Sequence, residues 1–290
     1  MNVFVYGVLA GVRPEPYGWL VLPLSLSNVV HRNRMSSSHF LITGASSGIG
    51  AALARRAAGP GIRLSLGGRD PARLSEVAAA CRAAGAEVET CLIDVTDRSA
   101  VRAWIEEADR DRLLDTVIAS AGISAGTGEG GESAEQARRI LAVNIDGVVN
   151  TVEPAIDVMR PRRQGRIALM SSMAGFVGFP GAPAYCASKA AVRLWGEALR
   201  TDLRRDGIHV SVVLPGFVRT PMTAVNRFPM PMLTEPERAA QLILRGIDRG
   251  RGRIAFPLPL YLCIRLIDAL PEKLRSPLLA RAPRKPSQPG

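Results

Sequence analysis

Short apolar runs alternate with longer stretches of helical periodicity along most of the chain. The runs predict seven strands, at residues 39–44, 63–69, 87–94, 114–122, 165–172, 208–216 and 253–257. Between them, helix starts can be recognised, such as Asp70 as an N-cap followed by Pro71 at the first helical position. Nearly continuous apolar strands are typical of a parallel sheet covered by helices on both faces. The pattern predicts an α/β doubly wound parallel sheet, a Rossmann fold of about seven strands in a single domain.

Both ends of the chain depart from this repeat. Residues 1–35 contain an apolar stretch too short to span a bilayer, interrupted afterwards by prolines, and we expect a poorly ordered N-terminal extension. A weak membrane-surface anchor is the alternative for this segment. The Rossmann domain is expected to cover residues 36–257. Residues 281–290, rich in Pro and Arg, are expected to form a disordered basic tail.

Residues 258–280 form a separate C-terminal extension. Leucine and isoleucine cluster here, with Arg265, Lys273 and Arg275 between them, and prolines interrupt the stretch. The pattern predicts an amphipathic helical extension, with one helix at about 260–270 and a second, shorter one. Such an extension covers the substrate site or an oligomer interface, or it lies on an anionic membrane.

Composition narrows the classes of protein. Of the 290 residues, 47% are hydrophobic, which excludes a mainly disordered chain, and the 28 glycines follow no three-residue period, which excludes a collagen-like one. The four cysteines have neither CxxC spacing nor the density of a disulfide-rich module, which indicates reduced thiols in a cytoplasmic protein. Peripheral contact with a membrane through the C-terminal extension is the alternative to a purely cytoplasmic location, and no metal is expected.

The net charge of +11 is concentrated near the C-terminus. Residues 245–290 hold eight Arg and two Lys against two Asp and one Glu, so they contribute +7 of it. A basic chain can bind nucleic acid, but single-strand binders interleave basic residues with aromatics, and Trp104 and Trp195 are not so arranged. We therefore expect no nucleic-acid partner.

A glycine-rich turn follows the first predicted strand, with the sequence TGASSGIG at residues 43–50 and an alanine-rich helix after it. Glycine permits a tight turn and lets the backbone approach a phosphate, while the helix N-terminus attracts the pyrophosphate. No Gly-Lys-Ser/Thr sequence follows, so this is not a Walker loop. The placement between a strand and a helix predicts a dinucleotide site, with a purely structural turn as the alternative.

The end of the second predicted strand selects between the two nicotinamide dinucleotides. An acid there hydrogen-bonds the ribose of NAD, whereas an arginine accommodates the 2′-phosphate of NADP. This chain has Gly68 at the acid position and Arg69 beside it, while Asp70 is interpreted as a helix cap. The sequence favours NADP over NAD. The alternative is that Arg69 is a surface arginine that binds no ligand.

Tyr185 and Lys189 form a second candidate site. Residues four apart lie on one helix face, so both side chains can address one ligand. A phenol is a poor acid or base at neutral pH unless a nearby ammonium lowers its pKa. The pair is therefore suited to proton transfer, although the same spacing also occurs in solvated pairs on amphipathic helices.

Together these residues resemble the short-chain dehydrogenase/reductase family, over residues 39 to about 257. The motifs are the glycine turn, Ser172 thirteen residues before Tyr185, and the Tyr-x-x-x-Lys sequence. The resemblance implies the catalytic residues Asn144, Ser172, Tyr185 and Lys189. It implies that the cofactor contacts Gly44, Ser46, Ser47, Gly48, Ile49, Gly50, Arg69, Asp94, Val95, Ala121, Gly122, Tyr185, Lys189, Pro215, Gly216, Val218 and Thr220.

The resemblance also implies a mechanism. The carbonyl oxygen of the substrate would lie between Ser172 and Tyr185, and Tyr185 would protonate it as hydride arrives from the nicotinamide. Lys189 would bind the nicotinamide ribose and lower the pKa of Tyr185, and Asn144 would bind a water that links Lys189 to solvent. Ser120 stands where the family usually has an asparagine that tethers the strand ends, so that tether is expected to be missing and the region to be less rigid.

Substrate and assembly are less determined by the sequence. The loop at 221–232 is apolar and Met-rich, which favours an apolar or lipid-like carbonyl compound, with ordinary packing as the alternative. The function expected is that of an NADP(H)-dependent carbonyl reductase or alcohol dehydrogenase. The alternative is a catalytically silent NADP-binding regulator or scaffold. The resemblance implies a homo-oligomer, a dimer or tetramer, that pairs through the helices expected at 132–162 and 184–206.

Overall fold

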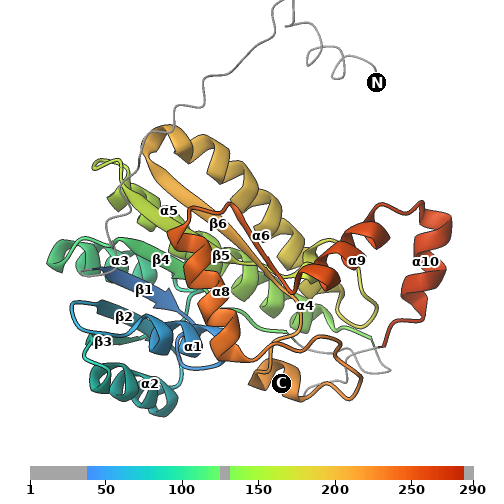
Figure 1. Ribbon diagram of the computed structural model, residues 1–290, viewed down its shortest axis with the longest axis horizontal. Coiled ribbons are helices and arrows are strands. Elements are labelled where there is room, and N and C mark those ends of the chain that lie inside the picture. The colour runs from blue at the N-terminus through green and yellow to red at the C-terminus, as the bar shows by residue number, and fades with distance from the viewer. Residues whose placement is uncertain (1–37, 125–130, 284–290) are drawn as a thin grey trace, which may run out of the picture. The chain divides into compact units, whose positions relative to one another are not determined.

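Seven parallel strands form the centre of the fold (Figure 1). The computed structural model describes residues 38–124 and 131–283; the expected N-terminal extension at 1–35 and the tail from residue 284 lie outside them. The strands are β1 (His39–Thr43), β2 (Arg63–Gly68), β3 (Glu87–Leu92), β4 (Thr116–Ala119), β5 (Gly165–Met170), β6 (Ile208–Pro215) and β7 (Arg253–Phe256). Their order is β3-β2-β1-β4-β5-β6-β7. The doubly wound parallel sheet predicted from the apolar runs is therefore confirmed.

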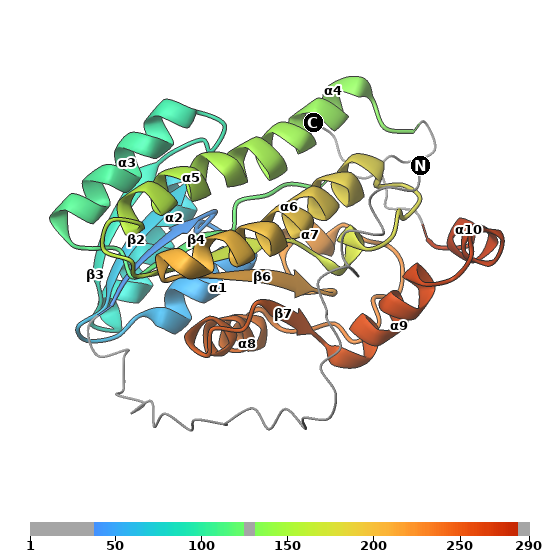
Figure 2. The ribbon, with the colours of Figure 1, turned by 90° about the horizontal axis from the view of Figure 1, so that it is seen from above.

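Helices cover both faces of the sheet (Figure 2). On one face lie α1 (Gly48–Ala57), α2 (Pro71–Ala83) and α8 (Pro236–Asp248), which pack on the sheet through buried side chains such as Leu53, Leu74 and Ile243. On the other lie α3 (Arg98–Asp111), α5 (Gly147–Met159) and α6 (Pro183–Asp202), through Val101 and Val152 among others. With both faces covered, the strands need apolar side chains in both directions, which explains their nearly continuous apolar sequences.

The strand order reverses between β1 and β4, so the connections leave these two strands toward opposite faces and open a crevice at their carboxyl ends. The Thr43 hydroxyl bridges the two ends, because it accepts hydrogen bonds from the backbone N–H groups of Ser120 at 3.1 Å and Ala121 at 3.3 Å. Thr43 thus makes a tether at the place where Ser120 replaces the expected asparagine. The same bonds end the pairing of β4 at Ala119, so the strand predicted at 114–122 is shorter than expected.

The long helix expected at 132–162 is divided. Its first part is α4 (Ala134–Leu141), its last part is α5, and a π-helical turn at Ala142–Asp146 joins them. Such turns within a helix are frequent at functional sites, and this one contains Asn144. The helix expected at 184–206 is α6, which ends at Asp202 and continues as a 3₁₀ turn.

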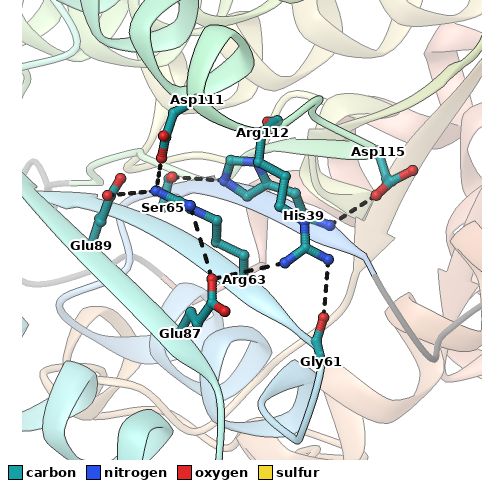
Figure 3. Close-up of polar contacts among 9 residues, drawn as sticks. All are labelled: His39, Gly61, Arg63, Ser65, Glu87, Glu89, Asp111, Arg112 and Asp115. Carbon is teal, nitrogen blue, oxygen red and sulfur yellow. Dashed lines mark hydrogen bonds and ion pairs between the residues drawn. The ribbon is translucent and has the colours of Figure 1, made fainter.

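A polar cluster closes the opposite end of the sheet, where β1, β2 and β3 begin (Figure 3). Arg63 forms ion pairs with Glu89 and Asp111. His39 is fully buried, with Nδ1 2.7 Å from the carbonyl oxygen of Arg112 and Nε2 2.9 Å from the Ser65 hydroxyl. Because burial disfavours its charged form, the pKa of His39 lies below the usual range. These contacts support the sheet at the end remote from the crevice.

Two further helices follow β7, as predicted for the C-terminal extension. They are α9 (Leu258–Asp268) and α10 (Glu272–Ala280), and they lie beyond the carboxyl ends of β6 and β7 (Figures 1 and 2). Ile264 is buried against a small cluster that includes Met173 and Phe176. In residues 38–124 and 131–283, no helix combines the length and the apolar character needed to cross a bilayer.

Candidate active site

A cleft of about 720 Å³ opens at the carboxyl ends of the strands, at the point where their order reverses. With the exception of Asn144, every residue assigned above to catalysis or to cofactor binding lines this cleft. They come from the segments after β1, β2, β3, β4, β5 and β6, and from α6. The fold thus brings together residues that are up to 176 positions apart, from Gly44 to Thr220. Their individual roles remain predictions.

The glycine turn after β1 fits a nucleotide phosphate. Gly44 has φ +67°, and a Cβ there would lie 2.7 Å from the Cα of Ala121, so this position requires glycine. A Cβ on Gly50 would lie 2.2 Å from the carbonyl oxygen of Gly44, which explains why the helix can approach the turn so closely. Ser47 is the N-cap residue of α1 but makes no side-chain capping bond, and no acid lies in the first turn. The N–H groups of this helix end are therefore suited to an anion.

The end of β2 forms the wall where the adenosine ribose of a dinucleotide would lie. Arg69 is 3.7 Å from Asp94, and both side chains are about half-exposed, so this ion pair is weak and leaves the guanidinium available to a phosphate. Asp70 caps α2 by accepting a bond from the N–H of Arg73 at 3.0 Å, as predicted. Arg73 also lines the cleft. Arg73 was not among the predicted cofactor residues, although its position four residues after Arg69 was a usable signal.

Tyr185 and Ser172 meet at the other end of the cleft. Ser172 follows β5 and accepts a bond from the N–H of Ala174 at 3.1 Å, which fixes its position. Its hydroxyl also forms a hydrogen bond with Tyr185. Burial raises the pKa of Tyr185 to about 12, and this effect exceeds the lowering by the Ser172 bond. The phenol is therefore protonated at neutral pH and can donate a proton to a substrate oxygen.

Lys189 lies one turn further along α6 and is almost completely buried, with 4% of its surface exposed. Its Nζ donates to the carbonyl oxygen of Met170 at 2.9 Å and lies 5.7 Å from the centre of the Tyr185 ring. Burial lowers the pKa of Lys189 to about 8. The sequence led us to expect that this ammonium lowers the pKa of Tyr185. In this structure burial outweighs any such effect, and the pKa of the phenol is raised.

Asn144 lies behind the cleft wall rather than on it. Its Oδ1 accepts from the N–H of Ile123 at 2.8 Å, and its Nδ2 donates to the carbonyl oxygen of Ile123 at 2.9 Å and to Ser188 Oγ at 3.0 Å. A Cβ on Gly122 would lie 3.2 Å from Asn144 Oδ1 and 3.3 Å from Lys189 Nζ, so both side chains pack closely against this glycine. Asn144 thus joins the segment after β4 to α6 through its side chain.

Two charged residues that were not predicted from the sequence also lie near the site. Arg139, an exposed residue of α4, lines the cleft. Glu132 Oε2 accepts a hydrogen bond of 3.0 Å from the N–H of Ala184, which lies in the first turn of α6. The N-cap residue of α6 itself provides no side-chain hydrogen bond. The Oε1 atom of Glu132 is buried without a hydrogen-bond partner. Glu132 therefore caps the helix that presents Tyr185, over a separation that no local motif reveals.

The segment after the turn at Pro215 covers one side of the cleft. Pro221–Ala224 form the short helix α7, and Met222 and Thr223 line the cleft. Farther along, Phe228 packs edge-on against Phe217, with ring centres 6.2 Å apart. This packing gives the apolar loop a defined path beside the cleft and accounts for part of its apolar composition.

Comparison with known proteins agrees with this geometry. A family model described as short chain dehydrogenase matches residues 38–229. An uncharacterized oxidoreductase of Myxococcus xanthus is 38% identical over 241 residues, which cover 83% of this chain and 95% of that protein.

Solved structures show the same fold with two different cofactors. A short-chain dehydrogenase of Sphingobium yanoikuyae in complex with NADPH has a TM-score of 0.72 at 29% identity, covering 85% of this chain and 96% of that one. A short-chain dehydrogenase/reductase of Burkholderia phymatum in complex with NAD has a TM-score of 0.74 at 26% identity, covering 88% and 99%. These similarities support a nicotinamide cofactor without selecting between NAD and NADP.

Proposed function

This chain belongs to the short-chain dehydrogenase family, and we propose that it is an NADP(H)-dependent oxidoreductase that interconverts an apolar carbonyl compound and its alcohol. One observation carries the proposal. Ser172, Tyr185 and Lys189 converge at one end of a cleft whose other end has a glycine turn and two arginines. Such an arrangement suits a dinucleotide that extends along the cleft and a carbonyl compound held at Tyr185.

The protein positions and protonates the substrate. A bound nicotinamide cofactor supplies the hydride chemistry. In reduction, the hydroxyl groups of Ser172 and Tyr185 hold the substrate oxygen, and their mutual hydrogen bond sets the direction from which it is held. Tyr185 donates its proton to the oxygen as negative charge develops there, because its raised pKa keeps the phenol protonated until then. Lys189 provides positive charge beside the phenolate that remains.

The preference for NADP rests on the end of β2. An acid at position 68 would repel a 2′-phosphate, but this position is glycine. A Cβ on Gly68 would lie only 3.0 Å from the Cβ of Ser46, so a larger residue would crowd Ser46 in the glycine turn. Arg69 and Arg73 both line this part of the cleft. Two guanidinium groups can bind a phosphate through charge-assisted, bidentate hydrogen bonds. Arg73, whose Nε donates to Asp70 Oδ2 at 2.7 Å, supplies a second guanidinium beside Arg69.

The apolar substrate is inferred from the loop after β6. Met222 and Val218 line the cleft on this side, and Ile123 and Val143 lie on the wall of the same cleft. An apolar wall with a few polar groups at one end is typical of a site for a small, largely hydrophobic molecule. A charged substrate would bury its charge here at a cost, which disfavours it.

We also propose that the protein forms a homo-oligomer through the outer faces of α5 and α6. Leu194 of α6 is 59% exposed and lies on the side of this helix that faces away from the sheet. Light scattering in solution tests the assembly. A monomer at micromolar concentration would contradict it, and Leu194→Arg should weaken the oligomer.

Turnover tests the proposed reaction directly. Wild-type protein is incubated with NADPH and a series of ketones and aldehydes of increasing apolar chain length, and loss of the reduced cofactor is followed by absorbance. We expect reduction that improves with chain length and falls at least a thousandfold in Tyr185→Phe. Tyr261→Phe, which removes a phenol outside the cleft, is the matched control. If wild type binds NADPH and reduces no carbonyl compound, the silent regulator replaces the enzyme as the better account.

A further inference from the structure

Exposed leucines are concentrated on the two C-terminal helices. Leu258, Leu262 and Leu266 lie four residues apart on α9, so they form one stripe along the helix. Leu274 and Leu278 are spaced in the same way on α10. Ten large hydrophobic side chains are exposed among the described residues, and these five lie within positions 258–278. We refer to these five residues as the leucine face.

The fold itself does not need the leucine face. The inner side of α9 is already packed, because Ile264 is buried and Leu260 and Tyr261 pack against the cluster that contains Phe176. Tyr261 meets the Phe176 ring edge-on at 5.7 Å. The helix is thus apolar on two sides, of which only one contributes to the core. A concentration of exposed apolar side chains that the core does not use indicates a surface that binds a partner.

The charges around the leucine face select the kind of partner. Lys273 lies beside Leu274 on α10 and Arg281 directly follows this helix, and both are exposed. The Arg265 guanidinium, in contrast, lies over the Phe176 ring, 4.8 Å from its centre, on the packed side of α9. The acidic Glu272 is paired with Arg275 at 2.5 Å. The sequence adds Arg284 and Lys285, so residues 258–290 hold four Arg and two Lys against Asp268 and Glu272, a net charge of +4. Two copies of this face would bring like charges together, whereas an anionic surface complements them.

We propose that the leucine face docks on an anionic lipid bilayer as a peripheral, interfacial contact. Leucines that enter the boundary between headgroups and acyl chains, with cations directed at the headgroups, are typical of helices that lie in the interface plane. Insertion across the bilayer is not involved, because neither α9 nor α10 is long enough.

The helix with the exposed leucines adjoins the active-site cleft. The Cδ2 atom of Leu260 is so close to Gly216 that a Cβ on this glycine would lie 2.7 Å from it, and Gly216 lines the cleft. The helix that carries the leucine face is therefore in direct contact with a wall of the cleft. The docking proposal does not depend on the proposed reaction, since its test measures binding to vesicles.

Co-sedimentation of the full-length protein with vesicles tests the proposal. Vesicles of phosphatidylcholine with about 30% phosphatidylglycerol supply an anionic surface, and pure phosphatidylcholine vesicles are the neutral comparison. We expect binding to the anionic vesicles that falls at least tenfold in the double variant Leu262→Ser and Leu266→Ser. The matched control replaces Leu92 and Leu113, which are 63% and 61% exposed elsewhere, by serine and should keep wild-type binding. Absence of anionic-vesicle binding by the folded wild type, or equal binding by all variants, would overturn the proposal.

Charge and depth provide two independent readouts. Lys273→Glu with Arg281→Glu should weaken binding, whereas Arg98→Glu with Arg110→Glu on α3 should not. A polarity-sensitive fluorophore on Cys263, the exposed one of the four cysteines and a residue of α9, should shift to the blue on anionic vesicles. If the leucine face instead covers a second copy, light scattering will show that the Leu262 and Leu266 changes dissociate an oligomer, and vesicles will not shift the fluorophore. That result would replace the membrane by a protein partner.

Discussion

Replacing Lys189 by methionine should change how the stability of the protein depends on pH. Lys189 is 4% exposed, and burial lowers its pKa from 10.5 to about 8. At 1.36 kcal/mol for each pKa unit, burying the ammonium costs roughly 3 kcal/mol at neutral pH. Methionine has a similar length and no charge, so it removes this cost. It also removes the hydrogen bond to the carbonyl oxygen of Met170, a loss of about 1–3 kcal/mol that opposes the gain.

The pH dependence separates the cost of burying the ammonium from the loss of the hydrogen bond. Only the burial cost changes with pH, because it depends on the difference between the pKa values of Lys189 in the folded and unfolded chain. Between pH 8 and 10.5 the unfolded chain keeps its proton on Lys189 while the folded protein has lost it, so the unfolded state binds more protons. The stability of the wild type therefore rises with pH through this window. For a native pKa of about 8, the rise from pH 7 to pH 9.5 is about 2 kcal/mol.

Urea denaturation at pH 7 and pH 9.5, at one protomer concentration, measures this difference. We expect the free energy of unfolding of the wild type to rise by about 2 kcal/mol relative to Lys189→Met over this interval. Lys273→Met, which removes an exposed ammonium of α10, is the matched control and should follow the wild type. A constant difference between wild type and Lys189→Met at the two pH values would refute the reasoning, because it would show that Lys189 titrates normally in the folded protein.

Three further outcomes follow from other parts of the structure. Gly50→Ala should weaken NADPH binding at least tenfold in a fluorescence titration, because its Cβ has no room, whereas Gly59→Ala, where nothing lies within 4 Å, should not. The pKa of His39 is lowered by burial, so wild type should lose stability relative to His39→Gln as the pH falls from 7.5 to 5, in urea denaturation. Glu132→Ala should lower the free energy of unfolding by about 1 kcal/mol and reduce kcat more than it changes KM, because it removes the cap of α6; unchanged kcat would contradict the positioning role.

The fold could be predicted because its main signals are local. All five residues of β1 are buried, and the three in its centre are apolar, so the strand is visible as an apolar run. Asp70 and Pro71 mark the start of α2 through capping chemistry that needs no tertiary contact. The glycine turn is visible for the same reason, since a positive φ at Gly44 and the close approach at Gly50 restrict the residue types there.

The details that escaped prediction depend on contacts between distant segments. The tether made by the Thr43 hydroxyl exists only because β1 and β4 are neighbours in space. The cap that Glu132 provides to α6 crosses 52 positions of the chain. The pKa of Tyr185 shows the same limit: its sequence neighbour Lys189 suggested a lowered value, but the degree of burial, which no spacing reveals, raises it.

Binding of the two dinucleotides tests the proposed preference for NADP. The wild type, Arg69→Ala and Arg98→Ala are each titrated with NADPH and NADH, and binding is followed by fluorescence. Arg98 is an exposed arginine outside the cleft, so Arg98→Ala is the control. The account predicts that NADPH binds at least tenfold more tightly than NADH, a difference of about 1.4 kcal/mol. It also predicts that Arg69→Ala removes this difference while Arg98→Ala keeps it. Equal affinity for the two, tighter binding of NADH, or no binding of either would contradict the account.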